Sequence, residues 1–304
     1  MGCSGYPPIK QYSLKYNLTK NTKDVSSIIE LPSGNILTAG AHGILYIWNK
    51  EYNEIIQTIR AHFKYIPDLL LFNERLLISI SEECIVRIWK IEDKIKMIGE
   101  SEISYNPLNI RKITSKYIAI GSSLGIKVYK FKISDNVYLM EEINFFPQNT
   151  EVNAICVIKD GRIAINSLYQ ILLWDYTIIK KKDIKKSFCY LKGHNRSVKC
   201  LLLLKNGNLV SGGEDKKIII WNTKKKEIIN ELNQHKGPVL SLYQLKEGNL
   251  VSGEKFSLIY IWSLDFSCVL QTLIENGSII RFYQLRTLEL CSISTDSEIK
   301  IWSY

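Results

Sequence analysis

Long hydrophobic runs are missing from this 304-residue chain. No apolar stretch reaches the roughly 18–20 residues that a membrane-crossing helix needs. The start "MGCSGYPPIKQYS" also lacks the apolar segment of a secretory signal. Proline is scarce, with 7 residues, while 46% of the residues are hydrophobic, and this composition excludes a disordered chain. We therefore expect a globular protein.

Cysteine pairs and catalytic motifs are also absent. The 7 cysteines are scattered without any C-x-x-C spacing, which favours a reducing compartment and indicates neither a disulfide framework nor a zinc site. The chain contains no phosphate-binding glycine loop, no H-E-x-x-H and no G-x-S-x-G. We expect no enzymatic activity, no metal and no cofactor. We also expect a cytoplasmic location, and the sequence leaves a nuclear one open.

The chain does contain a repeat. Segments such as "GILYIWN", "KKIIIWN" and "SEIKIWS" recur and include all 6 tryptophans. Tyr129, in "LGIKVYK", stands where a seventh tryptophan is missing, and neighbouring aromatic positions are then 40 to 47 residues apart. These positions are Trp48, Trp89, Tyr129, Trp174, Trp221, Trp262 and Trp302.

Each unit of the repeat reads as β-strands. In the fifth unit, residues 197–205, 208–213, 217–222 and 227–232 are aliphatic or β-branched runs separated by turn residues. Four short strands at a period of about 40–45 residues are typical of a β-propeller blade. The sequence thus predicts an all-β fold, a seven-bladed β-propeller of four-stranded antiparallel blades. We expect a single domain over residues 10–304 after a tail of residues 1–9.

The last unit ends one strand short, and an open sheet edge would remain there. The segment "KQYSLKYNL", residues 10–18, alternates Tyr12, Leu14, Tyr16 and Leu18 at the period of a strand. We expect this segment to pair with residues 298–303 in the last blade and so to close the ring.

The pattern resembles the WD-repeat family over nearly the whole chain, although Gly-His is intact only at residues 193–194 and Trp-Asp only at 174–175. A buried indole N–H left unpaired costs about 1–3 kcal/mol. The resemblance implies that a hydroxyl on the next strand accepts this N–H, that a histidine contacts the hydroxyl, and that an acid in the tight turn anchors the histidine. In the fifth unit these residues are Trp221, Ser211, His194 and Asp215, which we interpret as structural rather than catalytic.

The spacing in the other units supports this interpretation. A serine or threonine stands ten residues before every tryptophan except Trp174, which has Ala164, and Tyr129 likewise has Ala119. The hydroxyl residues are Thr38, Ser79, Ser211, Ser252 and Ser292. An acid stands six residues before three of the tryptophans, at Glu83, Asp215 and Asp296. Three of the 4 histidines, His62, His194 and His235, fall in the Gly-His position, and His42 does not.

The resemblance also implies a binding face, which carries the tight turns and the connections between blades. We call it the turn face. Its candidate residues lie just after the Gly-His position or just before the turn acid, and exposed aromatic residues there are typical interface anchors. The candidates are Phe63, Tyr65, Glu82, Glu151, Arg196, Lys236, Lys255 and Phe256, the last of which stands in place of a turn acid.

The opposite face carries lysine-rich loops between the third and fourth strands of two consecutive units. We call this set the lysine patch: Lys180, Lys181, Lys182, Lys185, Lys186, Lys224, Lys225 and Lys226. The net charge of +10 and this patch suit an acidic protein segment, RNA or an anionic membrane. The alternative is that the lysines are simply solvated.

The favoured function is a non-catalytic scaffold that binds one or more proteins, at least one with an acidic segment, as a monomer within a larger complex. Two alternatives stay open: a substrate receptor of a ubiquitin ligase, and a basic-face binder of RNA or membrane. Nucleic acid is not expected because no RNA-binding motif interleaves aromatics with the lysines. Membrane binding would need acylation at Gly2 and Cys3, and Tyr6 stands where that pattern requires serine or threonine.

Overall fold

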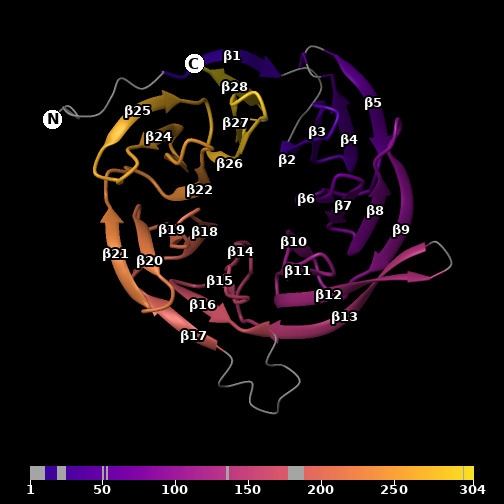
Figure 1. Ribbon diagram of the computed structural model, residues 1–304, viewed down its shortest axis with the longest axis horizontal. Coiled ribbons are helices and arrows are strands. Elements are labelled where there is room, and N and C mark those ends of the chain that lie inside the picture. The colour runs from indigo at the N-terminus through magenta and orange to yellow at the C-terminus, as the bar shows by residue number, and fades with distance from the viewer. Residues whose placement is uncertain are drawn as a thin grey trace. The chain divides into compact units, whose positions relative to one another are not determined.

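The computed structural model describes residues 11–18, 25–49, 51–52, 54–134, 137–176, 188–296 and 298–304. The chain divides into two compact units. The first unit is Ser26–Lys192, and the second unit joins Met1–Val25 to Gly193–Tyr304. Figure 1 shows the strands of both in chain order.

The first unit contains four antiparallel sheets whose strands follow one another in chain order. The first sheet has β2 (Val25–Glu30), β3 (Ile36–Gly40), β4 (Ile44–Trp48) and β5 (Ile55–Arg60). The second has β6 (Asp68–Asn73), β7 (Leu76–Ser81), β8 (Ile85–Lys90) and β9 (Lys96–Glu102). The third has β10 (Pro107–Lys112), β11 (Tyr117–Ser122), β12 (Gly125–Ser134) and β13 (Val137–Pro147). The fourth has β14 (Ile155–Val157), β15 (Ile163–Ser167), β16 (Gln170–Trp174) and β17 (Phe188–Lys192).

The second unit contains three more sheets of the same kind. One has β18 (Val198–Leu203), β19 (Leu209–Gly213), β20 (Ile218–Asn222) and β21 (Glu227–Leu232). The next has β22 (Val239–Gln244), β23 (Leu250–Glu254), β24 (Leu258–Trp262) and β25 (Val269–Ile274). The last has β26 (Ile279–Gln284), β27 (Leu290–Ser294), β28 (Ile299–Ser303) and, beside β28, β1 (Ser13–Leu18).

The seven four-stranded antiparallel sheets of the described residues are the blades of a seven-bladed β-propeller, so the predicted fold class is confirmed. We number the blades in chain order. Within the first unit β6 contacts β10 and β10 contacts β14, and within the second β18 contacts β22 and β22 contacts β26. The Ser27 hydroxyl of β2 donates to Asp68 of β6 at 3.3 Å. The apolar side chains pack between neighbouring blades: one cluster joins Leu37 and Leu45 of the first blade to Leu77 and Trp89 of the second. The middle strands are almost fully buried because both of their faces are covered in this way.

The predicted N-terminal strand completes the seventh blade. β1 pairs antiparallel with β28, and Leu18 lies opposite Ile299. A register shift between Leu14 and Tyr16 marks a β-bulge, which breaks the expected period-two alternation: Tyr12 and Leu18 are buried, whereas Leu14 and Tyr16 are exposed. The strand begins at Ser13 rather than at residue 10, which lies outside the described residues. The single-domain boundaries stay a prediction.

No helix in the described part of the chain is long and apolar enough to span a bilayer. Among the residues that the structure describes, Cys84, Cys156, Cys189, Cys200 and Cys291 carry free thiols. Cys268 is disulfide-bonded, so the scattered spacing did not exclude every disulfide.

Removing β1 should destabilise the propeller. Deletion through Leu18 removes one ladder of backbone hydrogen bonds and the buried Tyr12 and Leu18 side chains. We expect a loss of more than about 3 kcal/mol in the free energy of unfolding and a melting temperature lowered by roughly 5–10 °C. Thermal unfolding followed by circular dichroism checks this, with a deletion of residues 1–10 as the control. Equal melting temperatures for the two deletions would contradict the role of β1.

Candidate functional site

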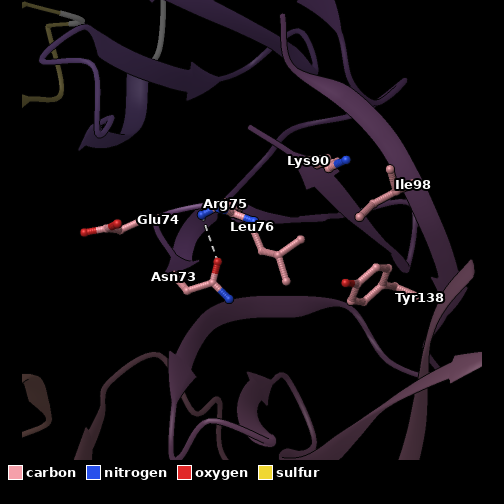
Figure 2. Close-up of a pocket in the computed structure, with 7 residues that line it drawn as sticks. All are labelled: Asn73, Glu74, Arg75, Leu76, Lys90, Ile98 and Tyr138. Atoms are coloured by element: carbon pink, nitrogen blue, oxygen red, sulfur yellow. Dashed lines mark hydrogen bonds between the residues drawn. The ribbon is translucent and has the colours of Figure 1, made fainter. Parts of the chain in front are cut away.

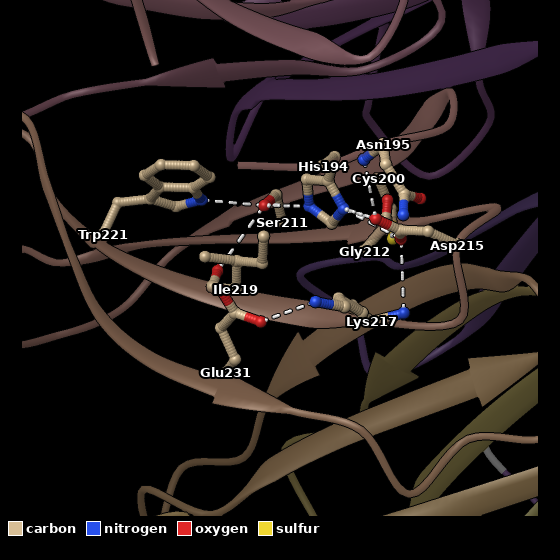
Figure 3. Close-up of polar contacts among 10 residues, drawn as sticks. All are labelled: His194, Asn195, Cys200, Ser211, Gly212, Asp215, Lys217, Ile219, Trp221 and Glu231. Carbon is tan, nitrogen blue, oxygen red and sulfur yellow. Dashed lines mark hydrogen bonds and ion pairs between the residues drawn. The ribbon is translucent and has the colours of Figure 1, made fainter. Parts of the chain in front are cut away.

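The fifth blade contains a continuous chain of buried hydrogen bonds (Figure 3). The indole Nε1 of Trp221, on β20, donates to Ser211 Oγ on β19 at 2.8 Å. His194 Nε2 lies 2.7 Å from the same hydroxyl. His194 Nδ1 lies 2.9 Å from the Asp215 carboxylate, in the tight turn between β19 and β20. Four segments of one blade are thereby joined through side chains alone.

The chemistry of the atoms fixes the direction of each bond. An indole N–H only donates and a carboxylate only accepts. The Ser211 hydroxyl therefore accepts from Trp221, and the Nδ1–H of His194 donates to Asp215. In a neutral His194 the other nitrogen, Nε2, then accepts from the Ser211 hydroxyl, which also lies 3.5 Å from the carbonyl oxygen of Ile219. A neutral histidine satisfies the whole chain.

Serine, histidine and aspartate in this order resemble the triad of a hydrolase, but Ser211 is 0% exposed. The side chains of His194 and Asp215 are only 1% and 2% exposed. A substrate carbonyl cannot reach the Ser211 hydroxyl, which is already engaged by the indole. The arrangement can hold strands together but cannot perform acyl transfer in this fold.

Gly213 makes room for this network. A Cβ atom at Gly213 would lie 2.7 Å from Asp215 Oδ1 and 2.8 Å from His194 Nδ1, too close for any side chain. Burial alone would raise the pKa of Asp215, but hydrogen bonds from His194 and from the amides of Asn195 and Lys217 outweigh burial and hold that pKa below its ordinary value. Asp215 is thus a fixed anion at neutral pH.

The second blade repeats the arrangement. Trp89 donates to Ser79 at 2.9 Å, and His62 Nε2 lies 2.7 Å from the same oxygen. His62 Nδ1 contacts Glu83 at 2.6 Å. Burial lowers the pKa of His62, although the hydrogen bond to Glu83 acts in the opposite direction. This histidine therefore resists protonation.

The sixth blade uses an acid that the sequence analysis missed. His235 contacts Ser252 at 2.6 Å, and its Nδ1 lies 2.9 Å from Glu254, at the end of β23. Glu254 stands two residues before Phe256, the residue at the expected acid position. Its carboxylate is fully buried and also accepts the amides of Lys236 and Gly237. Phe256 therefore occupies the turn position at which the second and fifth blades have their acid, and Glu254 supplies the acid of the sixth-blade network.

The seventh blade has no histidine, and a carboxylate takes its place. Trp302 donates to Ser292 at 2.8 Å, and the Ser292 hydroxyl donates to Glu275, seventeen residues earlier, the same separation as His194 to Ser211. The buried ammonium of Lys300 lies 2.8 Å from Glu275. Burial raises the pKa of Glu275, although Lys300 and Ser292 act against this. The expected turn acid, Asp296, is exposed and has no histidine to anchor.

The remaining blades keep less of the pattern. In the first blade Trp48 donates to Thr38 at 3.1 Å. In the fourth, Ala164 offers no acceptor and Trp174 packs on Phe146 with ring centroids 5.3 Å apart. In the third blade, which has Tyr129, the buried Lys127 lies 2.6 Å from Glu142. Its ammonium also stands over the rings of Tyr105 and Phe145.

The turn-face candidates are largely exposed, in contrast to the networks beneath them. Phe63 is 75% exposed and Phe256 is 59% exposed, whereas Tyr65 is half-buried. The charged candidates Glu82, Glu151, Arg196, Lys236 and Lys255 are all exposed. Within the second unit, Phe256 lies against Gly237, beside Lys236. The sequence analysis did not single out Leu124, Leu168 and Tyr169, three exposed side chains at the tight turns of the third and fourth blades.

Only part of the lysine patch can be placed. Lys224, Lys225 and Lys226 are exposed in the turn between β20 and β21, where Asn222 Oδ1 accepts the amides of Lys224 and Lys225. Lys180, Lys181, Lys182, Lys185 and Lys186 lie outside the described residues. Whether the two loops form one surface stays a prediction.

The comparisons with known proteins agree with the fold. Residues 185–222 match the WD40 family, described as "WD domain, G-beta repeat". This segment includes the Gly-His, serine, aspartate and tryptophan of the fifth-blade network. Together with the seven blades, this match supports a WD-repeat β-propeller, a class of proteins that generally act as non-catalytic interaction scaffolds.

A relative from Gallus gallus, "p21-activated protein kinase-interacting protein 1-like", is 35% identical over 77 residues. The matched part is 25% of this chain and 21% of the chicken protein. The likeness therefore covers about a fifth of the relative's length.

Removing the central hydroxyl should destabilise the fifth blade. Ser211→Ala leaves the Trp221 N–H and His194 Nε2 without their partner, and we expect a loss of about 1–3 kcal/mol in the free energy of unfolding. In a Trp221→Phe background the same substitution should cost less, because the indole N–H is already gone. Denaturant unfolding of the four proteins checks this. Ser33→Ala, at an exposed turn, is the control, and a loss no larger than the control's would count against the network.

The stabilisation from Asp215 should depend on pH. Because the folded-state pKa lies below the ordinary value of 3.8, the carboxylate stabilises the fold above about pH 4, and this is lost as the pH falls through the folded-state pKa. The difference in the free energy of unfolding between wild type and Asp215→Asn should be largest near pH 7 and should narrow at pH 3. A difference that stays constant with pH would contradict a charged Asp215.

Proposed function

We propose that this protein is a non-catalytic scaffold that binds partner proteins through its turn face, with Phe63 as an anchor in the first unit and a basic, aromatic surface in the second. The serine, histidine and acid side chains that could support chemistry are buried in the networks that tie strands together. The side chains at the surface of the same loops include the aromatic residues Phe63 and Phe256 and several charged residues.

The geometry of Phe63 carries this proposal. Its backbone amide donates to Glu83 Oε2 at 3.1 Å, so the second-blade network fixes the loop that bears it. Phe63 is nevertheless 75% exposed, and the guanidinium carbon of Arg60 lies over its ring, 5.9 Å from the ring centroid. An exposed aromatic side chain on an ordered backbone loses little entropy on binding, which favours an interface hot spot.

In the second unit the exposed charges of the turn-face loops are mainly positive. Two acids of these loops, Asp215 and Glu254, are buried on histidines, and Glu214 pairs with Lys199 at 2.8 Å. Arg196, Lys236 and Lys255 reach solvent, as does the acid Asp296 of the seventh blade. Phe256 adds an apolar contact between Lys236 and Lys255. This combination favours an acidic partner segment that also offers an apolar side chain.

The chicken relative is named for its interaction with a p21-activated protein kinase. This name supports the proposal that the partners of the present protein are proteins. No contact among the described residues favours a ubiquitin-ligase receptor or a binder of RNA or membrane over this scaffold. A cytoplasmic location stays part of the proposal.

Affinity purification with mass spectrometry tests the proposal on the tagged full-length protein. Phe63→Ser with Tyr65→Ser should lose partners that wild type retains, and Lys236→Glu with Lys255→Glu should lose a set rich in acidic segments. Ile56→Ser is the matched control, because Ile56 is 51% exposed on the outer strand β5, away from the turn face. If both double variants keep every wild-type partner, the turn face is not the binding surface.

A further inference from the structure

The hairpin of the third blade is longer than those of the other blades. β12 and β13 have 10 and 11 residues, whereas the third and fourth strands of the other blades have 5 to 7. The extra length carries β13 against β9 of the second blade, where Met140 N donates to Ser101 Oγ at 3.2 Å. The crossing requires a glycine at position 99, since a Cβ atom there would lie 2.1 Å from the carbonyl oxygen of Tyr138.

This crossing forms one wall of a cavity of about 670 Å³ in the first unit (Figure 2). We call it the hairpin pocket. Tyr138 comes from β13 and Ile98 from β9, and Lys90 ends β8. The turn between β6 and β7 supplies the other lining residues, Asn73, Glu74, Arg75 and Leu76. The volume falls within the roughly 300–1,000 Å³ typical of ligand pockets.

Three of the seven residues that line the hairpin pocket offer apolar surface. Leu76, Ile98 and the ring of Tyr138 are each half-buried. In a free protein this apolar surface stays hydrated, and covering it with an apolar side chain gains about 25 cal/mol per Å². The pocket therefore favours a ligand with an aliphatic or aromatic body.

The other lining residues are polar: Asn73, Arg75 and Lys90 carry hydrogen-bond donors, and Glu74 carries a carboxylate. Asn73 Oδ1 already accepts the amide of Arg75 at 2.8 Å, so its Nδ2 is the group left to meet a ligand. In Figure 2 the Lys90 ammonium points toward Ile98 and the Tyr138 hydroxyl toward Leu76, while the Glu74 carboxylate points away from both. Lys90 also pairs with Glu92 at 2.6 Å, but both side chains are nearly half exposed, and such surface pairs contribute only about 0–1 kcal/mol. Glu92 and Asp93 line a separate cavity of about 580 Å³.

We propose that the hairpin pocket binds a short segment of a partner protein in which a leucine-like side chain lies next to an aspartate or glutamate. The apolar side chain would cover Leu76, Ile98 and Tyr138, and the carboxylate would accept from Lys90 and Asn73. This proposal rests on the proposed function only in taking a protein as the occupant, and its site shares no residue with the turn face.

Fluorescence anisotropy with defined peptides tests the proposal on the full-length protein. The probe is fluorescein-labelled Asp-Leu-Asp-Leu-amide, and the isosteric Asn-Leu-Asn-Leu-amide removes only the charges. Wild type should bind the acidic peptide at least about tenfold more tightly than the neutral one. Lys90→Glu and Tyr138→Ser should each weaken acidic-peptide binding by about tenfold or more.

Two control variants test whether weaker binding arises at the pocket rather than from a change in net charge or from loss of folding. Lys116→Glu makes the same charge change at an exposed lysine of the β10–β11 turn. Leu139→Ser changes an exposed residue that is next to Tyr138 in the chain but does not line the pocket. Both should bind within about twofold of wild type, and melting curves verify that all four variants are folded.

Three results would overturn the proposal: no binding of the acidic peptide, equal binding of the neutral peptide, or equal weakening in the control variants. Sodium octanoate offers the same carboxylate and apolar body as a small molecule. Saturable octanoate binding that depends on Lys90, without peptide binding, would assign the pocket to a metabolite and reject a protein segment. None of these outcomes alters the partner losses expected from Phe63 and Tyr65, so the two proposals fail independently.

Discussion

The pairing of a buried indole N–H with a hydroxyl on the neighbouring strand is the constraint on which the rest of this structure depends. A four-stranded blade packed on both faces can bury a tryptophan only if its donor is satisfied. In five blades a serine or threonine ten residues earlier accepts it. The antiparallel register places this hydroxyl diagonally from the indole on the same face of the sheet: Leu209 lies opposite Trp221, and Ser211, two residues further along, lies opposite Ile219. The proton of that hydroxyl then needs an acceptor, which a histidine nitrogen provides in three blades. The other ring N–H of the histidine needs an acceptor in turn, and a carboxylate provides it.

Because each hydrogen-bonding group of the network is needed by the one before it, the loss of one residue is accompanied by changes at the positions that it would contact. Where the aromatic donor is Tyr129, the hydroxyl position is an alanine. In two of the four blades that lack the histidine, the third and the seventh, a lysine two residues before the aromatic position is buried against a carboxylate: Lys127 with Glu142 and Lys300 with Glu275. A buried cation paired with an anion can replace the imidazole between strands, although its desolvation makes the net gain in stability small.

The number of blades, the strand order and the hydroxyl positions could be predicted because each follows from spacing along one chain. Glu254 could not, since it reaches His235 from the end of a strand rather than from the turn, and only the path of the backbone decides which acid arrives. The bulge in β1 and the crossing of β13 over β9 depend on packing against another strand, which no local pattern encodes. The exposure of Phe63 was expected from its loop, but its anchoring by Glu83 became visible only in three dimensions.

The same constraint determines where binding can occur. The networks use the buried serines and histidines together with the acids Glu83, Asp215 and Glu254, so the side chains at the surface of those loops are the ones that can differ between blades. In the first unit these surface side chains include Phe63, Leu168 and Tyr169, and in the second they include Arg196, Lys236 and Lys255. A scaffold built this way can change its partners by substitutions that leave the buried hydrogen bonds intact. The long β12–β13 hairpin of the third blade is a second example. Its extra length adds Tyr138 to the lining of the hairpin pocket, and no residue of the hydrogen-bond networks lines that pocket.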